Sequence, residues 1–249
     1  MKRARLCAAA LLCALAIITL APSSATAETT IQISPPPLGF CDYANEKSQK
    51  QVEGTFANIS NDDNMDIVSL GATFKAMGVG KGGKGAMHFA IGGGVIGGEV
   101  VENDVTGINL NLSLTPALCL SDPKASIRPV VFAGGLMSVQ SMEIAMSGPN
   151  TKDTTMTMSS YGFQGGLQLM MGRDDVVIAP YFLMQSMSGT SSVDNGTTTS
   201  DSDFDYDAKA LGIDILFVKS GITLSSMVQA LTQEDDDTDM IIIQFGKKY

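Results

Sequence analysis

The chain has 249 residues, 26 glycines, no tryptophan and a formal net charge of −10. Such an acidic chain is not expected to bind nucleic acid, because the phosphate backbone would repel it. The length suits one domain, since β-barrels often reach this size undivided. No apolar run after Ala21 is long enough for a membrane-spanning helix.

Residues 1–27 have the three parts of a secretory signal peptide. Lys2, Arg3 and Arg5 form the charged region, residues 6–21 the apolar region, and Ala25-Thr26-Ala27 the cleavage site. The alternative, a retained membrane helix, would need a longer apolar run of ~20 residues. Cleavage after Ala27 would remove three basic residues and change the net charge from −10 to −13.

Residues 28–49 are expected to form a lead-in that does not pair as a strand. Pro35, Pro36 and Pro37 stiffen it, and proline lacks the amide donor that sheet pairing needs. We expect a periplasmic extension. The alternative is that this segment folds back into the barrel as a plug.

The remainder, residues 50–249, alternates between apolar and polar residues with a period of two, which predicts antiparallel hairpins. The clearest alternation sets Leu110 and Leu112 against Asn109 and Asn111. The predicted strands are 51–60, 65–78, 85–100, 104–119, 126–147, 154–172, 175–190, 203–218, 221–232 and 240–249.

The last ten residues read as a strand with one apolar face. That face carries Ile241, Ile243, Phe245 and Tyr249. An unpaired apolar edge invites aggregation, whereas closure of a barrel pairs the last strand with the first. The terminal strand therefore favours a closed barrel over an open sheet.

This ending resembles that of the bacterial outer-membrane β-barrels, whose last strand ends in an aromatic residue preceded by alternating apolar residues. Lys247 departs from the pattern, because an apolar residue is usual there. The resemblance covers residues 50–249, and in size and pattern the chain resembles the small OmpA- and OmpX-like barrels. It implies an all-β, antiparallel up-and-down transmembrane barrel of about ten strands, with eight strands or a soluble β-sandwich as alternatives.

The connections between the predicted strands fall into two classes. Those after even-numbered strands are short and close to a basic residue, namely Lys81, Lys84, Lys124, Arg173 or Lys219. Those after odd-numbered strands are mostly acidic, and two of them, 191–202 and 233–239, are long. Short turns inside and long loops outside are typical of outer-membrane barrels, so we expect periplasmic termini and extracellular acidic loops.

Polar residues on the other face of the strands are candidates for the barrel lumen. They are Lys75, Asp214, Gln164, Gln168, Asn109 and Asn111. Small residues such as Gly92 and Gly212 share this face, which predicts water-filled space inside ten strands.

Four aspartates, Asp201, Asp203, Asp205 and Asp207, alternate and would share one strand face. They are candidates for weak divalent-cation binding that bridges to lipopolysaccharide phosphates. The alternative is a solvated acidic rim. We expect no other metal site and no cofactor.

The remaining motifs do not favour an enzyme. Residues 78–84 fit the start of a phosphate-binding loop, but Gly85 replaces the hydroxyl residue that holds magnesium. His88 is the only histidine and has no catalytic motif around it. Met156 and Met158 are expected to form apolar wall rather than a Cu(I) site.

Cys41 and Cys119 are the cysteines that remain after signal cleavage. The compartment is oxidising, and the predicted topology brings both thiols to the periplasmic side. We therefore expect a disulfide between them. The alternative is two buried free thiols.

Together these features predict an integral outer-membrane protein of the Gram-negative cell envelope that forms a narrow, porin-like diffusion channel. The alternative is a structural or surface-binding barrel that acts through its acidic extracellular loops. Expected partners are outer-membrane lipid, lipopolysaccharide, the barrel-assembly machinery and an envelope protein of unknown identity. The sequence leaves open the solute and the oligomeric state.

Overall fold

The computed structural model describes residues 39, 41–44, 47–61, 65–146, 153–233 and 236–249. The predicted signal peptide and most of the predicted lead-in lie outside the described residues. Within the described part, no helix is long and apolar enough to cross a membrane.

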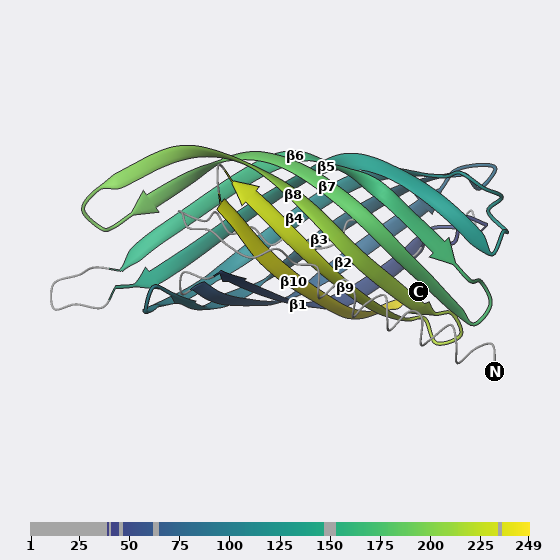
Figure 1. Cartoon of the computed structure of the whole chain (residues 1–249), viewed down its shortest axis with the longest axis horizontal. Helices are drawn as coiled ribbons and strands as arrows, with labels where there is room; N and C mark the ends of the chain where they lie inside the picture. Colours follow the sequence, from purple (N-terminus) through teal and green to yellow (C-terminus); the bar gives the residue numbers. More distant parts are fainter. Residues whose placement is uncertain (1–38, 40, 45–46, 62–64, 147–152, 234–235) are drawn as a thin grey trace.

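Ten antiparallel strands form one closed barrel in which each strand pairs with its neighbours along the chain (Figure 1). The strands are β1 (Gln49–Asn61), β2 (Met65–Val79), β3 (Gly85–Val100), β4 (Asn103–Cys119), β5 (Ile127–Ala145), β6 (Thr154–Met171), β7 (Val176–Asp194), β8 (Thr199–Phe217), β9 (Ile222–Gln233) and β10 (Asp236–Lys248). The predicted fold class and strand number are confirmed.

The barrel closes between β1 and β10, with Val52 opposite Lys247. Tyr249 and Lys50 add two backbone hydrogen bonds beyond the last paired strand residue, with N···O distances of 2.7 and 3.3 Å. The apolar terminal strand therefore has no free edge. Both chain ends of the barrel lie at one end, which we call the terminal mouth; the opposite end, with the 195–198 turn, is the hairpin end.

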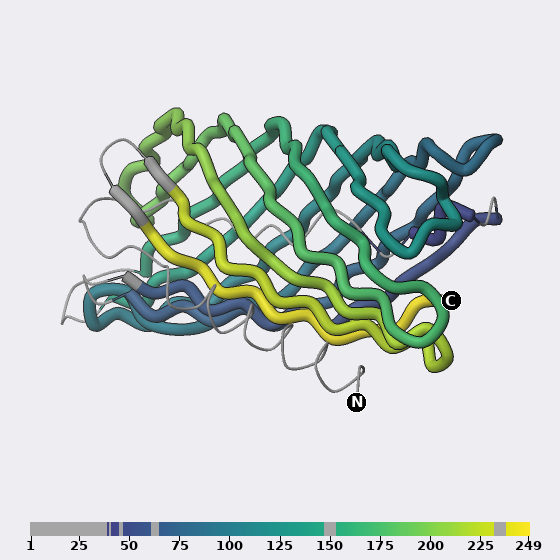
Figure 2. The backbone as a smooth tube through the Cα atoms, turned by 45° about the vertical axis from the view of Figure 1, so that its right-hand side comes forward, coloured from purple at the N-terminus to yellow at the C-terminus, as the bar shows by residue number. Residues whose placement is uncertain are grey.

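The strands are strongly inclined to the barrel axis (Figure 2). Stepping from Val52 to its partner on each next strand, through β2 to β7, leads to Asp205 on β8. Stepping the other way, through β10 and β9, leads to Phe217 on β8. The two end points on β8 differ by 12 residues, which is the offset of the closed barrel. With standard strand spacings this offset gives a tilt of about 40° and a backbone radius of about 10 Å. Long side chains from the wall can fill much of such an interior.

Side chains alternate between the inside and the outside of the barrel along every strand. The outward positions form an apolar belt that includes Phe56, Leu70, Phe74, Phe89, Ile91, Leu110, Leu112, Tyr161, Phe163, Leu167, Leu211, Ile243 and Phe245. An outer surface that is apolar on all sides suits the hydrocarbon core of a membrane. Closure of the barrel meets the second requirement of that environment, because it leaves no strand edge with unpaired backbone groups.

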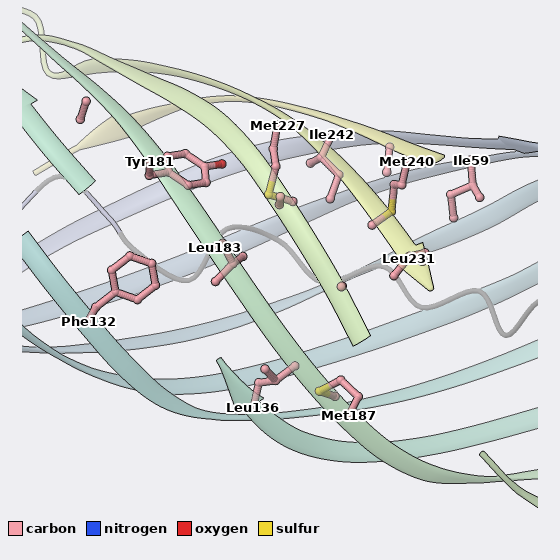
Figure 3. Packing of buried hydrophobic residues seen from close by; sticks show 14 of the residues in the cluster. Ile59, Phe132, Leu136, Tyr181, Leu183, Met187, Met227, Leu231, Met240 and Ile242 are labelled. Carbon is pink, nitrogen blue, oxygen red and sulfur yellow. The ribbon is translucent and has the colours of Figure 1, made fainter. Parts of the chain in front are cut away.

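The interior has two halves of different chemistry. The buried charged side chains, Glu53, Lys75, Arg128 and Asp214, lie in the half nearer the terminal mouth. The half nearer the hairpin end is mainly apolar, with Ile59, Ile67, Met65, Met142, Met158, Met187, Leu231, Met240 and Ile242, and it also holds the buried Ser138, Gln140, Ser160, Ser191 and Thr238. Figure 3 shows several of these apolar side chains pointing into the interior from different strands.

Several inward glycines provide room for large neighbours rather than open space. A Cβ atom on Gly212 would lie 2.2 Å from the Tyr181 ring, and one on Gly166 would lie 2.8 Å from the Phe132 ring. The aromatic rings therefore cover the glycines of the next strand. The small inward residues, from which we predicted water-filled space, leave less of it than their size suggests.

The predicted difference in loop length between the two ends is wrong. The residues between β7 and β8 are only 195–198, and those between β3 and β4 only 101–102; the longest connection at the hairpin end is 146–153, and the longest at the terminal mouth is 120–126. Most of the segment 191–202 is strand, and β10 begins at Asp236, so the segment 233–239 is not a long loop either. The asymmetry lies in strand length: the β7–β8 hairpin extends beyond β9 and β10 (Figure 1).

Candidate lumen site

An ion pair lies inside the barrel in the half near the terminal mouth. The Lys75 Nζ and Glu53 Oε2 atoms are 2.7 Å apart, and both side chains are almost completely buried, at 1% and 0% exposed. Lys75 also donates to Gln244 Oε1 at 3.5 Å. Both residues point into the barrel from the adjacent strands β1 and β2. They lie close together because Lys75 is paired with Gln51, which is two residues from Glu53 on the same face.

Polar side chains next to this pair bond across one intervening strand. Gln168 on β6 donates to Asp214 on β8, with an Nε2–Oδ2 distance of 3.1 Å. Gln164 on β6 donates to Thr115 on β4 at 2.8 Å. These hydrogen bonds cross the inner surface of the barrel, so the polar layer links strands that share no backbone hydrogen bonds.

The same pattern continues around the barrel. Gln229 on β9 donates to Gln185 on β7, and Thr223 on β9 donates to Glu53 on β1, both at 3.3 Å. Asn109 on β4 donates to Ser69 on β2, also at 3.3 Å. The interior therefore carries a hydrogen-bonded polar layer with contributions from most strands.

The structure places all six predicted lumen residues inside the barrel, where each is at most 7% exposed: Lys75, Asp214, Gln164, Gln168, Asn109 and Asn111. It connects Gln168 directly to Asp214 and places Gln164 in the same layer. Sequence reasoning missed Glu53, whose signal was present, because Gln51 and Glu53 alternate with apolar Val52 in a strand that we expected but did not assign to faces. Gln244 was not named as a lumen candidate, although it alternates with the apolar Ile243 and Phe245 of the terminal strand.

The polar layer has more hydrogen-bonding capacity than its protein partners use. Among the described residues, the buried atoms Asn111 Oδ1, Tyr181 OH, Gln229 Oε1 and His88 Nε2 have no hydrogen-bond partner. Leaving such a group without any partner costs about 1–3 kcal/mol. In folded proteins such atoms are usually satisfied by water, so this layer is suited to hold water.

Part of the lead-in packs inside the terminal mouth. Gly39 donates its backbone N–H to His88 Nδ1 at 3.4 Å, and a Cβ on Gly39 would touch Met77. Cys41 and Tyr43 are each 1% exposed. Burial raises the pKa of the Tyr43 phenol above its ordinary value. The described part of the lead-in therefore narrows the mouth from within.

The expected disulfide between Cys41 and Cys119 is absent, and both residues are free, buried cysteines. Each thiol has a separate hydrogen-bond partner. Cys119 Sγ lies 3.7 Å from the Ser121 carbonyl oxygen, and Cys41 Sγ accepts from Gln49 Nε2 at 4.0 Å. Both cysteines do lie at the terminal mouth, in one cluster of buried residues.

The four aspartates proposed for cation binding, Asp201, Asp203, Asp205 and Asp207, lie on the exposed face of β8 rather than in a loop. Alternate residues of a strand are ~7 Å apart, so a straight column does not converge on one ion. The described residues contain no group of three or more His, Cys, Asp or Glu side chains that could hold a metal ion.

Comparison with known proteins identifies relatives in structure only. No protein-family model matches the chain. No curated protein matches it either. The outer membrane protease OmpT from Escherichia coli superimposes with a TM-score of 0.53 at 8% identity, over 81% of this chain and 96% of that chain.

Two further solved structures are less similar. A major outer membrane protein from Thermus thermophilus has a TM-score of 0.45 at 10% identity, over 82% of this chain and 100% of that chain. The outer membrane protein OprG from Pseudomonas aeruginosa has a TM-score of 0.40 at 11% identity, over 83% of this chain and 98% of that chain. Identities this low show the fold alone. The chain therefore has the fold of the bacterial outer-membrane β-barrels, in a ten-stranded, antiparallel up-and-down form.

Proposed function

We propose that this protein is an integral barrel of the bacterial outer membrane that forms a narrow, water-filled diffusion channel without enzymatic activity. The observation that carries the proposal is the buried polar layer, whose unpartnered atoms suit a hydrated passage. A barrel that served only as a scaffold could fill this layer with apolar side chains.

The narrowest part of the passage is the layer that contains Glu53, Lys75 and Asp214. Asp214 lies within electrostatic range of both Lys75 and Glu53. Two carboxylates and one ammonium group face the same space, so a small cation is favoured over an anion if both carboxylates are ionised. The lead-in at the terminal mouth acts as a second, removable constriction.

The orientation follows the general pattern of single-chain barrels with an even number of strands. We place the terminal mouth in the periplasm and the hairpin end outside the cell. Outer-membrane lipid and lipopolysaccharide surround the belt, and the barrel-assembly machinery inserts the chain.

Conductance in planar lipid bilayers tests the channel. The mature chain should give small, discrete conductance steps. A shortened chain that lacks residues 28–47 should give larger steps, because its mouth no longer holds Gly39, Cys41 and Tyr43. If neither chain conducts, the channel proposal is wrong.

Ion selectivity tests the position of the constriction. Asp214→Asn removes a negative charge from the polar layer and should lower cation selectivity, measured as the reversal potential in a salt gradient. Asp203→Asn makes the same change on the exposed face of β8 and is the matched control. Equal reversal potentials in the two variants would place the constriction elsewhere.

A second candidate function is surface binding, and the outer face of β5–β8 favours it. A groove of about 450 Å³ there is lined by hydroxyl side chains, by Asp203 and Asp205, and by apolar Met137 and Val139. Ser159 and Thr190 already bond to each other in it, with an Oγ–Oγ1 distance of 3.1 Å. Calcium-dependent adhesion to lipopolysaccharide that is lost in Asp203→Asn/Asp205→Asn, in a chain that does not conduct, would support this function instead.

A further inference from the structure

A second cavity, of about 290 Å³, lies at the terminal mouth between the lead-in and the inner wall of the barrel. Cys41, Asp42 and Ala44 line it on one side. On the other side, β5 to β8 and the end of β10 contribute Arg128, Met170, Val177, Leu216 and Lys248. The turns add Arg173 and Asp174 between β6 and β7, and Val218 between β8 and β9.

Three cations face this cavity. Arg128 is 4% exposed and donates from Nη2 to the Gly172 carbonyl oxygen at 2.9 Å. Arg173 donates from Nη1 to the Lys124 carbonyl oxygen at 3.0 Å. Within the described residues, neither guanidinium forms a salt bridge with a carboxylate, and neither does Lys248. The carbonyl bonds fix the two arginines in place but leave their charges unbalanced.

Arg128 supplies the strongest indication of a ligand. Its Nε–H is buried and has no hydrogen-bond partner among the residues that the structure describes, although the side chain lines the cavity. A guanidinium group donates in a planar fork that matches the two oxygens of a carboxylate or phosphate. An unpaired, buried donor of this kind is costly, and an anion in the cavity would remove that cost.

The carboxylates that line the cavity do not fill this role. Asp42 Oδ1 accepts from the backbone N–H of Ala44 at 3.1 Å, which closes the turn of the lead-in. Asp174 is exposed to solvent in the β6–β7 turn. Three cations against two carboxylates leave the cavity with one excess positive charge in a protein whose net charge is −10.

We propose that this cavity is a binding site for a small oxyanion, held by Arg128, Arg173 and Lys248. The volume accommodates inorganic phosphate or a short organic acid. Met170, Val177 and Leu216 give one wall an apolar character that suits the carbon chain of a carboxylate. The site does not depend on passage of solutes through the barrel, so a chain that shows no conductance would still bind the anion.

The test is a titration of the full mature chain, folded in detergent micelles in chloride-free buffer. Inorganic phosphate is followed by ³¹P NMR, and butyrate by ligand-observed ¹H NMR. Saturable binding of either anion is the expected result. Phosphate binding alone would assign the site to phosphate-type anions, and tighter butyrate binding would assign it to organic acids.

Three variants decide whether the cavity is responsible. Arg128→Met and Arg173→Gln should each weaken binding at least tenfold, because each removes a charged donor from the cavity. Lys219→Gln is the matched control, since Lys219 is an exposed cation at the same end that pairs with Asp175 at 2.8 Å. It should change the dissociation constant less than twofold.

Arg173 is exposed, so its substitution leaves the barrel core intact even if Arg128→Met prevents folding. Circular dichroism and heat-modifiable migration show which variants are folded. The proposal is overturned if neither anion binds saturably. It is equally overturned if folded Arg173→Gln binds as tightly as the Lys219→Gln control.

Discussion

Lys75 and Glu53 depend on each other because both side chains are buried in the wall of the barrel and their charged atoms are 2.7 Å apart. Lys75→Met should destabilise the barrel by about 3–5 kcal/mol, since it leaves the Glu53 carboxylate buried without its cation. The double variant Glu53→Gln/Lys75→Met should recover most of that loss. Urea-induced unfolding from lipid vesicles, followed by intrinsic tyrosine fluorescence, measures both.

Lys209→Met is the matched control for this pair, because Lys209 is exposed on the outer face of β8. An exposed substitution away from special contacts typically changes stability by less than about 0.5 kcal/mol. A double variant as unstable as Lys75→Met would show that the ion pair is not the reason for the destabilisation.

The Cys41 thiol should react slowly in the folded protein. Burial raises its pKa to about 12 from an ordinary value of 9.0. At pH 8 the thiolate fraction is then roughly 1,000-fold smaller than in the unfolded chain, and the thiolate is the reactive form. Alkylation by iodoacetamide, quantified by mass spectrometry, should accelerate as the pH is raised from 8 to 11.

The same pKa has a consequence for stability. The folded state keeps the thiol proton above pH 9, where the unfolded chain loses it, so this contribution to stability declines as the pH rises from 9 towards 12. Ser48→Cys, an exposed position in the lead-in, is the fast-reacting control. Cys41 and Cys119 that resist alkylation after unfolding without reductant would contradict the free thiols of the structure.

At the scale of elements, the extension of β7 and β8 shows where sequence reasoning stops. Apolar side chains mark a strand by their alternation, and that signal ends where the belt ends. The predicted strands end at residue 190 and begin again at residue 203, whereas residues 191–194 and 199–202 are strand too; they are mostly serine, threonine and aspartate, a composition that is also typical of loops. Backbone pairing between β7 and β8 nevertheless continues through both segments and begins with the pair Asp194 and Thr199 next to the turn.

This extension limits where the hairpin tolerates insertions. An epitope inserted at Asn195 should leave the barrel folded, because 195–198 is the turn between the strands. The same insertion at Asp203 should impair folding, since Asp203 is paired with Thr190 within the sheet. Heat-modifiable migration of the two variants measures folding, and labelling of intact cells reports whether Asn195 is extracellular.

Equal folding of the two insertion variants would show that β8 does not extend beyond the belt in the membrane. Labelling of Asn195 only after permeabilisation of the outer membrane would reverse the proposed orientation, and folding of the barrel would be unaffected. The two readouts therefore separate the length of the strand from its direction.

At the scale of the whole molecule, the barrel could be predicted because its two faces meet different surroundings. The belt requires apolar residues at every second position, and this period is visible along most strands. The contents of the lumen were harder to predict. Gln168 and Asp214 are 46 residues apart. The register of β6 and β8 against β7 brings them together, because Gln168 pairs with Tyr181 and Tyr181 pairs with Gly212, two residues from Asp214.

The cavity beside Arg128 could not be predicted for a related reason. The arginine stands at the start of β5, and the cavity needs the lead-in as its second wall. The short-range pattern places Arg128 inside the barrel, through the buried Val130 and Phe132 that follow on the same face. It carries no information on what lies opposite.

The seam between β1 and β10 sets the order of events during folding. Every other pair of neighbouring strands is joined by a short connection, but the seam joins Phe56 to Ile243, at almost opposite ends of the chain. The entropy of closing such a long loop is lost before any seam contact compensates for it, so the hairpins should form first and the seam last. Until that final step the protein is an open sheet whose two edge strands, β1 and β10, have unpaired backbone groups. The lifetime of this intermediate therefore determines how much protein is lost to aggregation.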